Sequence, residues 1–319
     1  MSALGITIPF GGPLAEHGPL LAELTAAGYT EFWTAETART DAFTPLAYAA
    51  ALAPTAQLGT AIASVFVRGP AMLAMSAAAL AESAPGRFTL GIGSSSPVLV
   101  HDWNSTPYEK PLARVRDSVR FLRAALHGEK IDHEYETFTV RGFRLERIPE
   151  TPPPIMVGAL GPAMLRLAGK EADGAILNWL SADDAGRVAA EVPGNGDLAA
   201  RIFVCPSTDA DTVRASARRL IAGYLTVPAY ERFHRWLGRG EALGPMWSSW
   251  AAGDRKTAAA SVPDDVVDAL FVHGSPAECA AHLRRYRSAG ITRPIVKMLP
   301  LDPNTDLTQG AVAVARALA

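Results

Sequence analysis

Cysteine and strongly basic segments are scarce in this chain of 319 residues. Its two cysteines, Cys205 and Cys279, lie far apart in the sequence, which favours free, buried thiols in a reducing compartment over a disulfide. The 30 Lys and Arg residues are interspersed with 32 Asp and Glu residues, and the formal net charge is -2. Without a basic run to follow a phosphate backbone, nucleic acid is not expected as a partner.

A long hydrophobic run and an export signal are missing as well. The first twenty residues contain no Lys or Arg, and Gly11, Gly12 and Pro13 interrupt any apolar segment there. The longest run of small apolar residues, 71–81, is too short to span a bilayer and ends at Glu82, so it predicts a buried helix. We therefore expect a soluble, cytoplasmic protein with no membrane partner.

Motifs for metal binding and for serine nucleophiles are also absent. The seven histidines show no paired spacing and no His-Glu-x-x-His, and the two cysteines have no close partner. No Gly-x-Ser-x-Gly occurs either. The sequence thus predicts no metal site and no hydrolase-type nucleophile.

Apolar residues are plentiful, at 49% of the chain against 19% charged, which is enough to build a large core. Short runs rich in Ile, Val, Phe and Leu alternate with longer segments of helical periodicity, as in repeated βα units around a parallel sheet. Eight such units favour a closed TIM (β/α)8 barrel, in one domain spanning 1–319, over an open doubly wound sheet. The predicted strands are 4–9, 31–35, 57–63, 88–93, 154–159, 175–179, 201–205 and 293–299.

Two intervals interrupt this repeat. Residues 128–153 contain the alternating pattern 135–140, which we interpret as an inserted hairpin that closes over one barrel end. Residues 225–263 place Trp236, Trp247 and Trp250 among Gly, Pro and Arg, which predicts a longer excursion with short helices.

Two helix starts carry clear signals. Thr44-Pro45 and Ser275-Pro276 each join an N-cap residue to proline at the first helical position. Ser275 and Glu278 also have the spacing of a capping box.

The segment 88–96 is the most informative candidate site. An apolar strand there runs into Gly93, Ser94 and Ser95, small residues whose backbone amides lie open to a phosphate or a flat ring. Taken alone, the segment fits an ordinary strand-to-loop turn equally well. In a TIM barrel, however, active sites lie where strands end, so the residues that follow the other predicted strands belong to the same site.

Four stretches, 36–46, 58–62, 86–93 and 173–176, occur in an order that resembles the recurring blocks of the bacterial luciferase-like superfamily of flavin- and deazaflavin-dependent oxidoreductases. The version found here is closest to the branch that uses the deazaflavin coenzyme F420. This resemblance implies hydride transfer between F420 and a small organic substrate. An FMN-dependent monooxygenase that uses molecular oxygen is the alternative, and a non-catalytic barrel subunit or ligand-binding protein is a second one.

The resemblance also implies where the cofactor lies. A non-proline cis peptide in the third strand would form a bulge behind the ring, and the matching bond joins Ala61 and Ile62, with a plain trans strand as the alternative. The loop 158–162 precedes a helix, so it holds the cofactor phosphate or forms a simple turn. The implied cofactor-binding residues are Ala61, Ile62, Gly93, Ser94, Ser95, Gly158, Ala159, Gly161 and Asn178. For Asn178, a buried amide satisfied by backbone is the alternative.

Proton transfer is assigned first to Glu36, which follows the second strand, although some family members carry histidine one place later, where this chain has Thr37. His101 is the second catalytic candidate, with a surface His-Asp pair as the alternative reading. Asp41 fits a helix-entry or ion-pair residue, paired with Arg39. The residues that we expect to line the substrate pocket are Asp102, Trp103 and Trp179.

The assembly is the least determined property. Relatives in this superfamily are often dimers, and the apolar helix 71–81 serves either a homodimer interface or the core.

Overall fold

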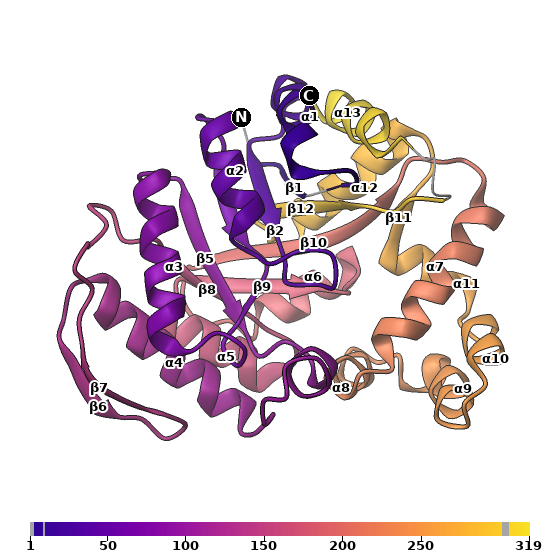
Figure 1. The fold of residues 1–319 in the computed structure, drawn as a ribbon. Helices are drawn as coiled ribbons and strands as arrows, with labels where there is room; N and C mark the ends of the chain where they lie inside the picture. Colours follow the sequence, from indigo (N-terminus) through magenta and orange to yellow (C-terminus); the bar gives the residue numbers. More distant parts are fainter. Residues whose placement is uncertain (1–2, 9, 302–305) are drawn as a thin grey trace.

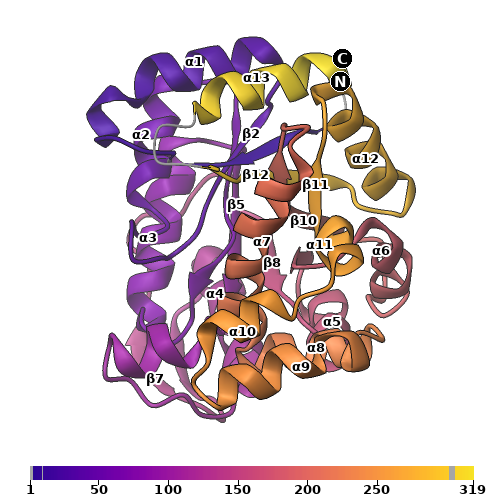
Figure 2. The same ribbon diagram turned by 90° about the vertical axis from the view of Figure 1, so that its right-hand side faces the viewer.

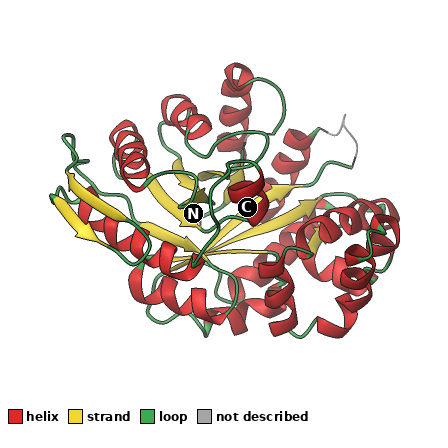
Figure 3. Ribbon diagram, turned by 60° about the horizontal axis from the view of Figure 1, so that its bottom comes forward, coloured by secondary structure: helices red, strands yellow, loops and turns green. Residues whose placement is uncertain are grey.

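Parallel strands form a closed ring with helices around it in the computed structural model, which describes residues 3–8, 10–301 and 306–319 (Figures 1 and 3). Hydrogen-bonded pairing runs from strand to strand around the ring, and the last strand pairs with the first. This closure confirms the predicted TIM barrel. In order, the ring consists of β1 (Gly5–Thr7), β2 (Glu31–Thr34), β3 (Gln57–Thr60), β5 (Phe88–Gly93), β8 (Ile155–Gly158), β9 (Gly174–Asn178), β10 (Asp197–Cys205) and β12 (Arg293–Met298).

Each predicted strand overlaps one strand of the ring, with three differences. The prediction 57–63 corresponds to two pieces, β3 and the short β4 (Ala63–Ser64), which are separated by an irregular step. The strand β10 begins at Asp197, four residues before the predicted start at Arg201. A further strand, β11 (Phe271–His273), pairs with the end of β10 and was not predicted, because it is very short and follows a helix directly. Residue 9 of the prediction 4–9 lies outside the described residues.

Helices cover the outside of the ring (Figure 1). The predicted buried helix over 71–81 is α3, which buries one face against the barrel. In the part of the chain that the structure describes, no helix is both long and apolar enough to cross a membrane. The helices are α1 (His17–Ala27), α2 (Thr44–Leu52), α3 (Pro70–Ser83), α4 (Pro111–Leu126), α5 (Pro162–Glu171), α6 (Ala182–Ala189), α7 (Ala210–Leu225), α8 (Pro228–Trp236), α9 (Gly240–Ala251), α10 (Arg255–Ala260), α11 (Asp264–Leu270), α12 (Pro276–Ser288) and α13 (Leu307–Leu318).

The first predicted insertion is a hairpin of β6 (Ile131–Glu134) and β7 (Thr139–Phe143), as expected. Its aromatic residues pack on Phe121 of α4, whose ring centroid lies 6.3 Å from Tyr135, 6.1 Å from Phe138 and 5.7 Å from Phe143. The hairpin therefore lies along the outside of α4 (Figure 1), and the expectation that it closes over a barrel end is wrong.

The second insertion contains α8, α9 and α10, which confirms the predicted excursion with short helices. Figure 2 shows these helices grouped beside α7. They are not loosely attached, because Trp247 is buried and its indole N–H donates to the Leu225 carbonyl at 2.9 Å.

Of the two predicted helix starts, one has the expected cap. The Ser275 hydroxyl accepts from the Glu278 amide at 3.3 Å, and the Glu278 carboxylate accepts from the Ser275 amide at 2.7 Å, which confirms the capping box. At α2 the N-cap is Phe43 and the helix already begins at Thr44, so the prediction of Thr44 as the N-cap is wrong. The Asp41 carboxylate accepts from the first amides of this helix instead, from Phe43 at 2.7 Å and from Thr44 at 3.0 Å.

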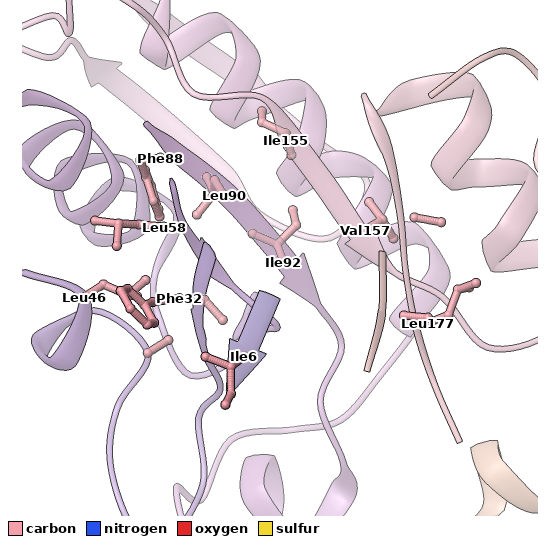
Figure 4. Close-up of a cluster of buried hydrophobic side chains, with 14 of the residues drawn as sticks. Ile6, Phe32, Leu46, Leu58, Phe88, Leu90, Ile92, Ile155, Val157 and Leu177 are labelled. Atoms are coloured by element: carbon pink, nitrogen blue, oxygen red, sulfur yellow. The ribbon is translucent and has the colours of Figure 1, made fainter. Parts of the chain in front are cut away.

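Side chains alternate between the two faces of the barrel strands, as the β pleat requires. Figure 4 shows the outward set, from Ile6 and Phe32 to Val157 and Leu177, in the layer between the barrel and its helices. A smaller inward set forms a separate buried cluster on the barrel axis. Its members are Trp33, Met156, Ile176, Ala199 and Ile295.

The amino-terminal half of the barrel is filled. Arg293 Nε lies 3.0 Å from Glu31 Oε1, and the Trp33 indole N–H donates to Glu31 Oε2 at 2.8 Å. Arg293 also donates to Thr89 Oγ1 at 3.2 Å. A Cβ on Gly59 would lie 2.3 Å from the Trp33 ring, so only glycine leaves space for that ring. A ligand can therefore approach the barrel axis only from the carboxyl-terminal end.

Candidate functional site

Inward-facing residues gather at the carboxyl ends of the strands, and we call this group the cup. Because inward side chains recur every second residue, the positions two residues beyond Ile176, Ala199 and Ile295 also point inward. Those positions remain partly exposed to solvent, whereas the inward cluster beneath them is buried. The partly exposed residues at this level are Ala61, Ile62, Gly158, Asn178, Arg201 and Lys297.

The bulge between β3 and β4 contains a cis peptide bond joining Ala61 and Ile62, as predicted. The Ile62 side chain extends over two neighbouring strands, since a Cβ on Gly93 would lie 3.2 Å from it and a Cβ on Gly158 would lie 3.0 Å from it. The absence of side chains at both glycines thus leaves space for the bulge. The structure brings together four of the predicted cofactor-binding residues here.

Glu36 holds this bulge in place. Its amide donates to the Ile62 carbonyl at 3.3 Å, and its Oε2 accepts from the Ser64 amide at 2.8 Å. Its Oε1 accepts from Arg68 Nε at 2.7 Å, and only 10% of the Glu36 side chain is exposed. Both carboxylate oxygens are occupied, which suits a positioning residue better than a proton donor. Arg68 was not singled out in the sequence, because a cation after a strand is usually a surface residue.

Asp41 has the helix-entry role described above and also an ion pair, although not with the expected partner. Its Oδ1 lies 3.4 Å from Arg68 Nη2. Burial acts to raise the pKa of Asp41, but hydrogen bonds from Thr44 and Phe43 and the charge of Arg68 outweigh it and lower the pKa. Arg39 donates instead to the Phe10 carbonyl.

Within the predicted phosphate loop, 158–162, the amide of Ala159 is already hydrogen-bonded, whereas the residues after Gly161 begin a helix. The Ala159 amide donates to the Ile176 carbonyl at 2.9 Å, so the expectation that this amide is free for a ligand is wrong. Gly161, by contrast, has a φ of 79° and precedes α5, where no side chain caps the helix. The first-turn amides of α5 therefore lack a side-chain acceptor and suit an anion.

Ser94 and Ser95 follow β5 and are partly buried. Ser95 has a φ of 59°, and its carbonyl accepts from the Tyr108 hydroxyl at 3.3 Å. This contact fixes the backbone of the loop and leaves both serine hydroxyls without a partner among the described residues.

Asn178 is not satisfied by backbone. Its Nδ2 donates to the Tyr230 hydroxyl at 2.9 Å, and its Oδ1 is buried with no partner in the described part of the chain. The Thr7 hydroxyl on β1 is likewise buried and unpaired there. Because buried polar atoms normally have partners, these two atoms fit a polar ligand in the cup. Tyr230 comes from α8, so only the folded insertion could reveal it.

Two cations in the cup escaped the sequence analysis. Arg201 and Lys297 lie on the adjacent strands β10 and β12, where Arg201 is opposite Ile295 and Phe203 is opposite Lys297. Burial, together with the charges of Arg201 and Arg39, lowers the pKa of Lys297 to about 7. Burial also lowers the pKa of Arg201. The sequence signal for both cations is that each lies two residues after an inward apolar residue, Ala199 or Ile295. This signal can be recognised only when the inward face of each strand is known.

His101 and Asp102 lie on the surface. They occupy a short π-helical turn, Val98–Asp102, where His101 Nδ1 is 2.9 Å from Asp102 Oδ1 and both side chains are largely exposed. His101 borders an open hollow of about 640 Å³. Trp103 follows and is 55% exposed. The surface-pair interpretation describes this geometry, and the structure does not place these three residues among the strand ends.

Trp179 is part of the core, so its expected role as a pocket wall is wrong. It is 1% exposed, and its ring centroid lies 4.2 Å from that of Phe203 and 5.6 Å from that of Phe271. A φ of 57° turns the chain at this point, and the indole is buried behind Phe203 and Tyr224, whose ring centroids lie 4.2 and 5.2 Å from that of Trp179. Among the described residues, no group of three or more His, Cys, Asp or Glu side chains is placed to ligate a metal ion.

The family model for luciferase-like monooxygenases matches residues 4–293. The chain belongs to this family. A Mycobacterium tuberculosis relative, whose name gives coenzyme F420-dependent oxidoreductase as its inferred activity, is 27% identical over 92% of this chain and 94% of its own length. The predicted family and enzyme class are thereby confirmed.

Several solved structures share this fold. The coenzyme F420-dependent tetrahydromethanopterin reductase from Methanopyrus kandleri superposes with a TM-score of 0.82 at 19% identity, covering 99% of this chain and 98% of that one. An F420-dependent secondary alcohol dehydrogenase in complex with an F420–acetone adduct has a TM-score of 0.77 at 16% identity and covers 100% and 99%. The FMN-bound oxygenating constituent of 3,6-diketocamphane monooxygenase from Pseudomonas putida has a TM-score of 0.67 at 18% identity and covers 100% and 98%.

Proposed function

We propose that this protein is a coenzyme F420-dependent oxidoreductase that exchanges a hydride between the deazaflavin and a small organic substrate. The observation that carries the proposal is the Ala61–Ile62 bulge among the partly exposed residues of the cup, with glycine on both sides of Ile62. Side chains at Gly93 or Gly158 would displace Ile62, so the two glycines preserve the bulge on which a flat ring would rest. The F420-dependent activities named for several relatives favour the deazaflavin over other flat cofactors.

The residues in the cup suit this group. The cis bulge and the two glycines would support the ring, and Asn178 Oδ1 and the Thr7 hydroxyl would meet its polar edge. The uncapped amino terminus of α5, next to Gly161, would hold the phosphate. When bound, F420 supplies the two-electron hydride chemistry that amino-acid side chains lack.

The chain's own contribution is binding and orientation. Glu36 and Arg68 fix the bulge on which the ring would rest. The Glu31–Arg293 pair and Trp33 close the barrel below, so the ligands can meet only on the upper side of the inner cluster. Positions held in this way favour reaction by keeping the reacting groups aligned.

Direct titration tests the proposal. We expect purified protein to bind F420, measured by fluorescence, more tightly than FMN. Changing Gly158→Leu fills the surface beside Ile62 and should weaken F420 binding roughly tenfold or more, since about 1.4 kcal/mol of added strain already changes Kd tenfold. Gly186→Leu is the matched control, because Gly186 is exposed on α6 and an added Cβ meets nothing within 4 Å.

The outcomes separate the alternatives. Tighter binding of FMN than of F420 would replace the proposal with the FMN-dependent monooxygenase. Binding of neither cofactor would favour a non-catalytic barrel. Equal F420 affinity in the Gly158→Leu variant and the wild type would contradict the proposed position of the ring.

A further inference from the structure

The cup contains two cations that have no acidic partner. Arg201 and Lys297 project inward from neighbouring strands, each two residues beyond a member of the inner cluster. Both remain partly exposed, so solvent or a ligand can reach them from the open end. Within residues 3–8, 10–301 and 306–319, no carboxylate lies at ion-pair distance from either cation, and Arg201 Nε has no hydrogen-bond partner at all.

This arrangement is unfavourable as it stands. Two like charges that are mostly buried repel each other, and charged groups inside proteins are normally paired. The contrast within one strand is clear, because Arg293, at the other end of β12, is paired with Glu31 at 3.0 Å. At the amino-terminal end of the barrel, the charge of Arg293 is therefore neutralised by Glu31. At the carboxyl-terminal end, Arg201 and Lys297 have no such negative partner among the residues that the structure describes.

The residues around Arg201 and Lys297 indicate which ligand would fit there. The Arg201 guanidinium lies over the Phe203 ring, 5.5 Å from its centroid, and the Tyr224 hydroxyl is beside it. Arginine presents a planar set of donors that matches a carboxylate, and lysine adds a point charge with rotatable donors. Tyr230 hydrogen-bonds to Asn178 at the edge of the same space. The site is thus rich in hydrogen-bond donors, which suits a carboxylate.

We propose that Arg201 and Lys297 bind a carboxylate of the substrate, so that the substrate is a small organic acid. The proposal rests on the proposed function in placing the redox cofactor beside this carboxylate, on the Ile62 side of the cup. A carboxylate belonging to the cofactor would use the same chemistry, and the experiment below distinguishes the two sources.

The test uses acetate as the probe and acetamide as its uncharged counterpart. Binding is followed by saturation-transfer NMR of the probe's methyl group, with and without saturating F420. Arg201→Met and Lys297→Met should each weaken acetate binding roughly tenfold or more, the usual effect of losing a charge-assisted hydrogen bond. Acetamide should bind weakly to all variants, and the Kd for F420 should stay unchanged.

Lys130→Met and Arg316→Gln are matched controls. Lys130 follows α4 and Arg316 lies on α13, both exposed and both in segments that return the chain to the amino-terminal end of the barrel. They remove the same charges without touching the cup and should leave acetate binding at the wild-type value.

Three results would overturn the assignment: unchanged acetate binding in both cup variants, equal binding of acetamide and acetate, or a loss of F420 affinity without a loss of acetate affinity. The last result would mean that the pair holds the cofactor. Failure of the wild type to bind F420, with acetate binding still dependent on Lys297, would instead refute the proposed function and leave the carboxylate subsite standing.

Discussion

Replacing Lys297 by methionine should stabilise the protein in a way that depends on pH. Methionine keeps an unbranched apolar side chain but removes the charge that burial, Arg201 and Arg39 disfavour. In the fold the pKa of Lys297 is about 7, against 10.5 for a lysine in water. At about 1.4 kcal/mol per pKa unit, keeping Lys297 charged costs the folded wild type about 5 kcal/mol below pH 7.

The sign of the pH dependence follows from proton binding. Between pH 7 and 10.5 the folded state has released the Lys297 proton, whereas the unfolded chain still holds it. Wild-type stability, relative to Lys297→Met, therefore rises with pH across this window and is flat below it. Tyr230, in the same region, does not titrate there, because burial raises its pKa to about 12. The charged groups that face Lys297 are Arg201 and Arg39, and Tyr224 lies beside Arg201.

Urea unfolding at pH 6, 7, 8 and 9 measures this effect. We expect Lys297→Met to be several kcal/mol more stable than wild type at pH 6, and the difference to shrink by about 1.4 kcal/mol for each pH unit above 7. Lys130→Met, which removes an exposed lysine, should show no such trend. A difference that stays constant from pH 6 to 9 would refute the reasoning, because it would mean that Lys297 has an ordinary pKa in the fold.

Three further changes test other parts of the structure. Gly59→Ala should cost about 1–3 kcal/mol of stability in thermal unfolding, because the added Cβ would lie 2.3 Å from Trp33; a neutral effect would contradict the packing of that ring. Glu36→Gln should weaken F420 binding about tenfold by removing the Arg68 ion pair beside the bulge, while unaltered affinity would show that the bulge holds its shape unaided. Ser275→Ala should lower the free energy of unfolding by about 1 kcal/mol, and no loss would mean that the capping box is dispensable.

The strands were predictable because their outward faces carry the largest apolar side chains. Leu58, Leu90 and Val157 pack between barrel and helices, so each strand appears in the sequence as an apolar run. The apolar pattern could not predict a strand of only three residues that follows a helix directly, such as β11. Nor could it predict the interruption at Ala61–Ile62, which only the family resemblance indicated. The position of the hairpin on α4 depended on a tertiary contact with Phe121.

In the candidate site, too, some residues were predicted from the sequence and others were not. Gly93 was identified because small residues after a strand leave the backbone open to a ligand, and Gly158 because the family resemblance implies a cofactor loop there. Arg201 and Lys297 were missed because a charge in a strand normally faces solvent, and only the closed ring shows that their faces point inward. Trp179 was misplaced because the rings that bury it, Phe203 and Phe271, come from β10 and β11, and this contact depends on the tertiary fold.

The pairing of β1 with β12 has a consequence for how this chain is made. Gly5 lies beside Ile295 and Ile6 beside Val296, so β1 must wait for the much later synthesis of β12 before this edge is covered (Figure 1). Until β12 is made, the edges of β1 and β10 that pair with it offer unsatisfied main-chain groups to other polypeptides. A truncated chain that ends before residue 293 would contain every helix except α13, but its barrel would stay open and prone to aggregation.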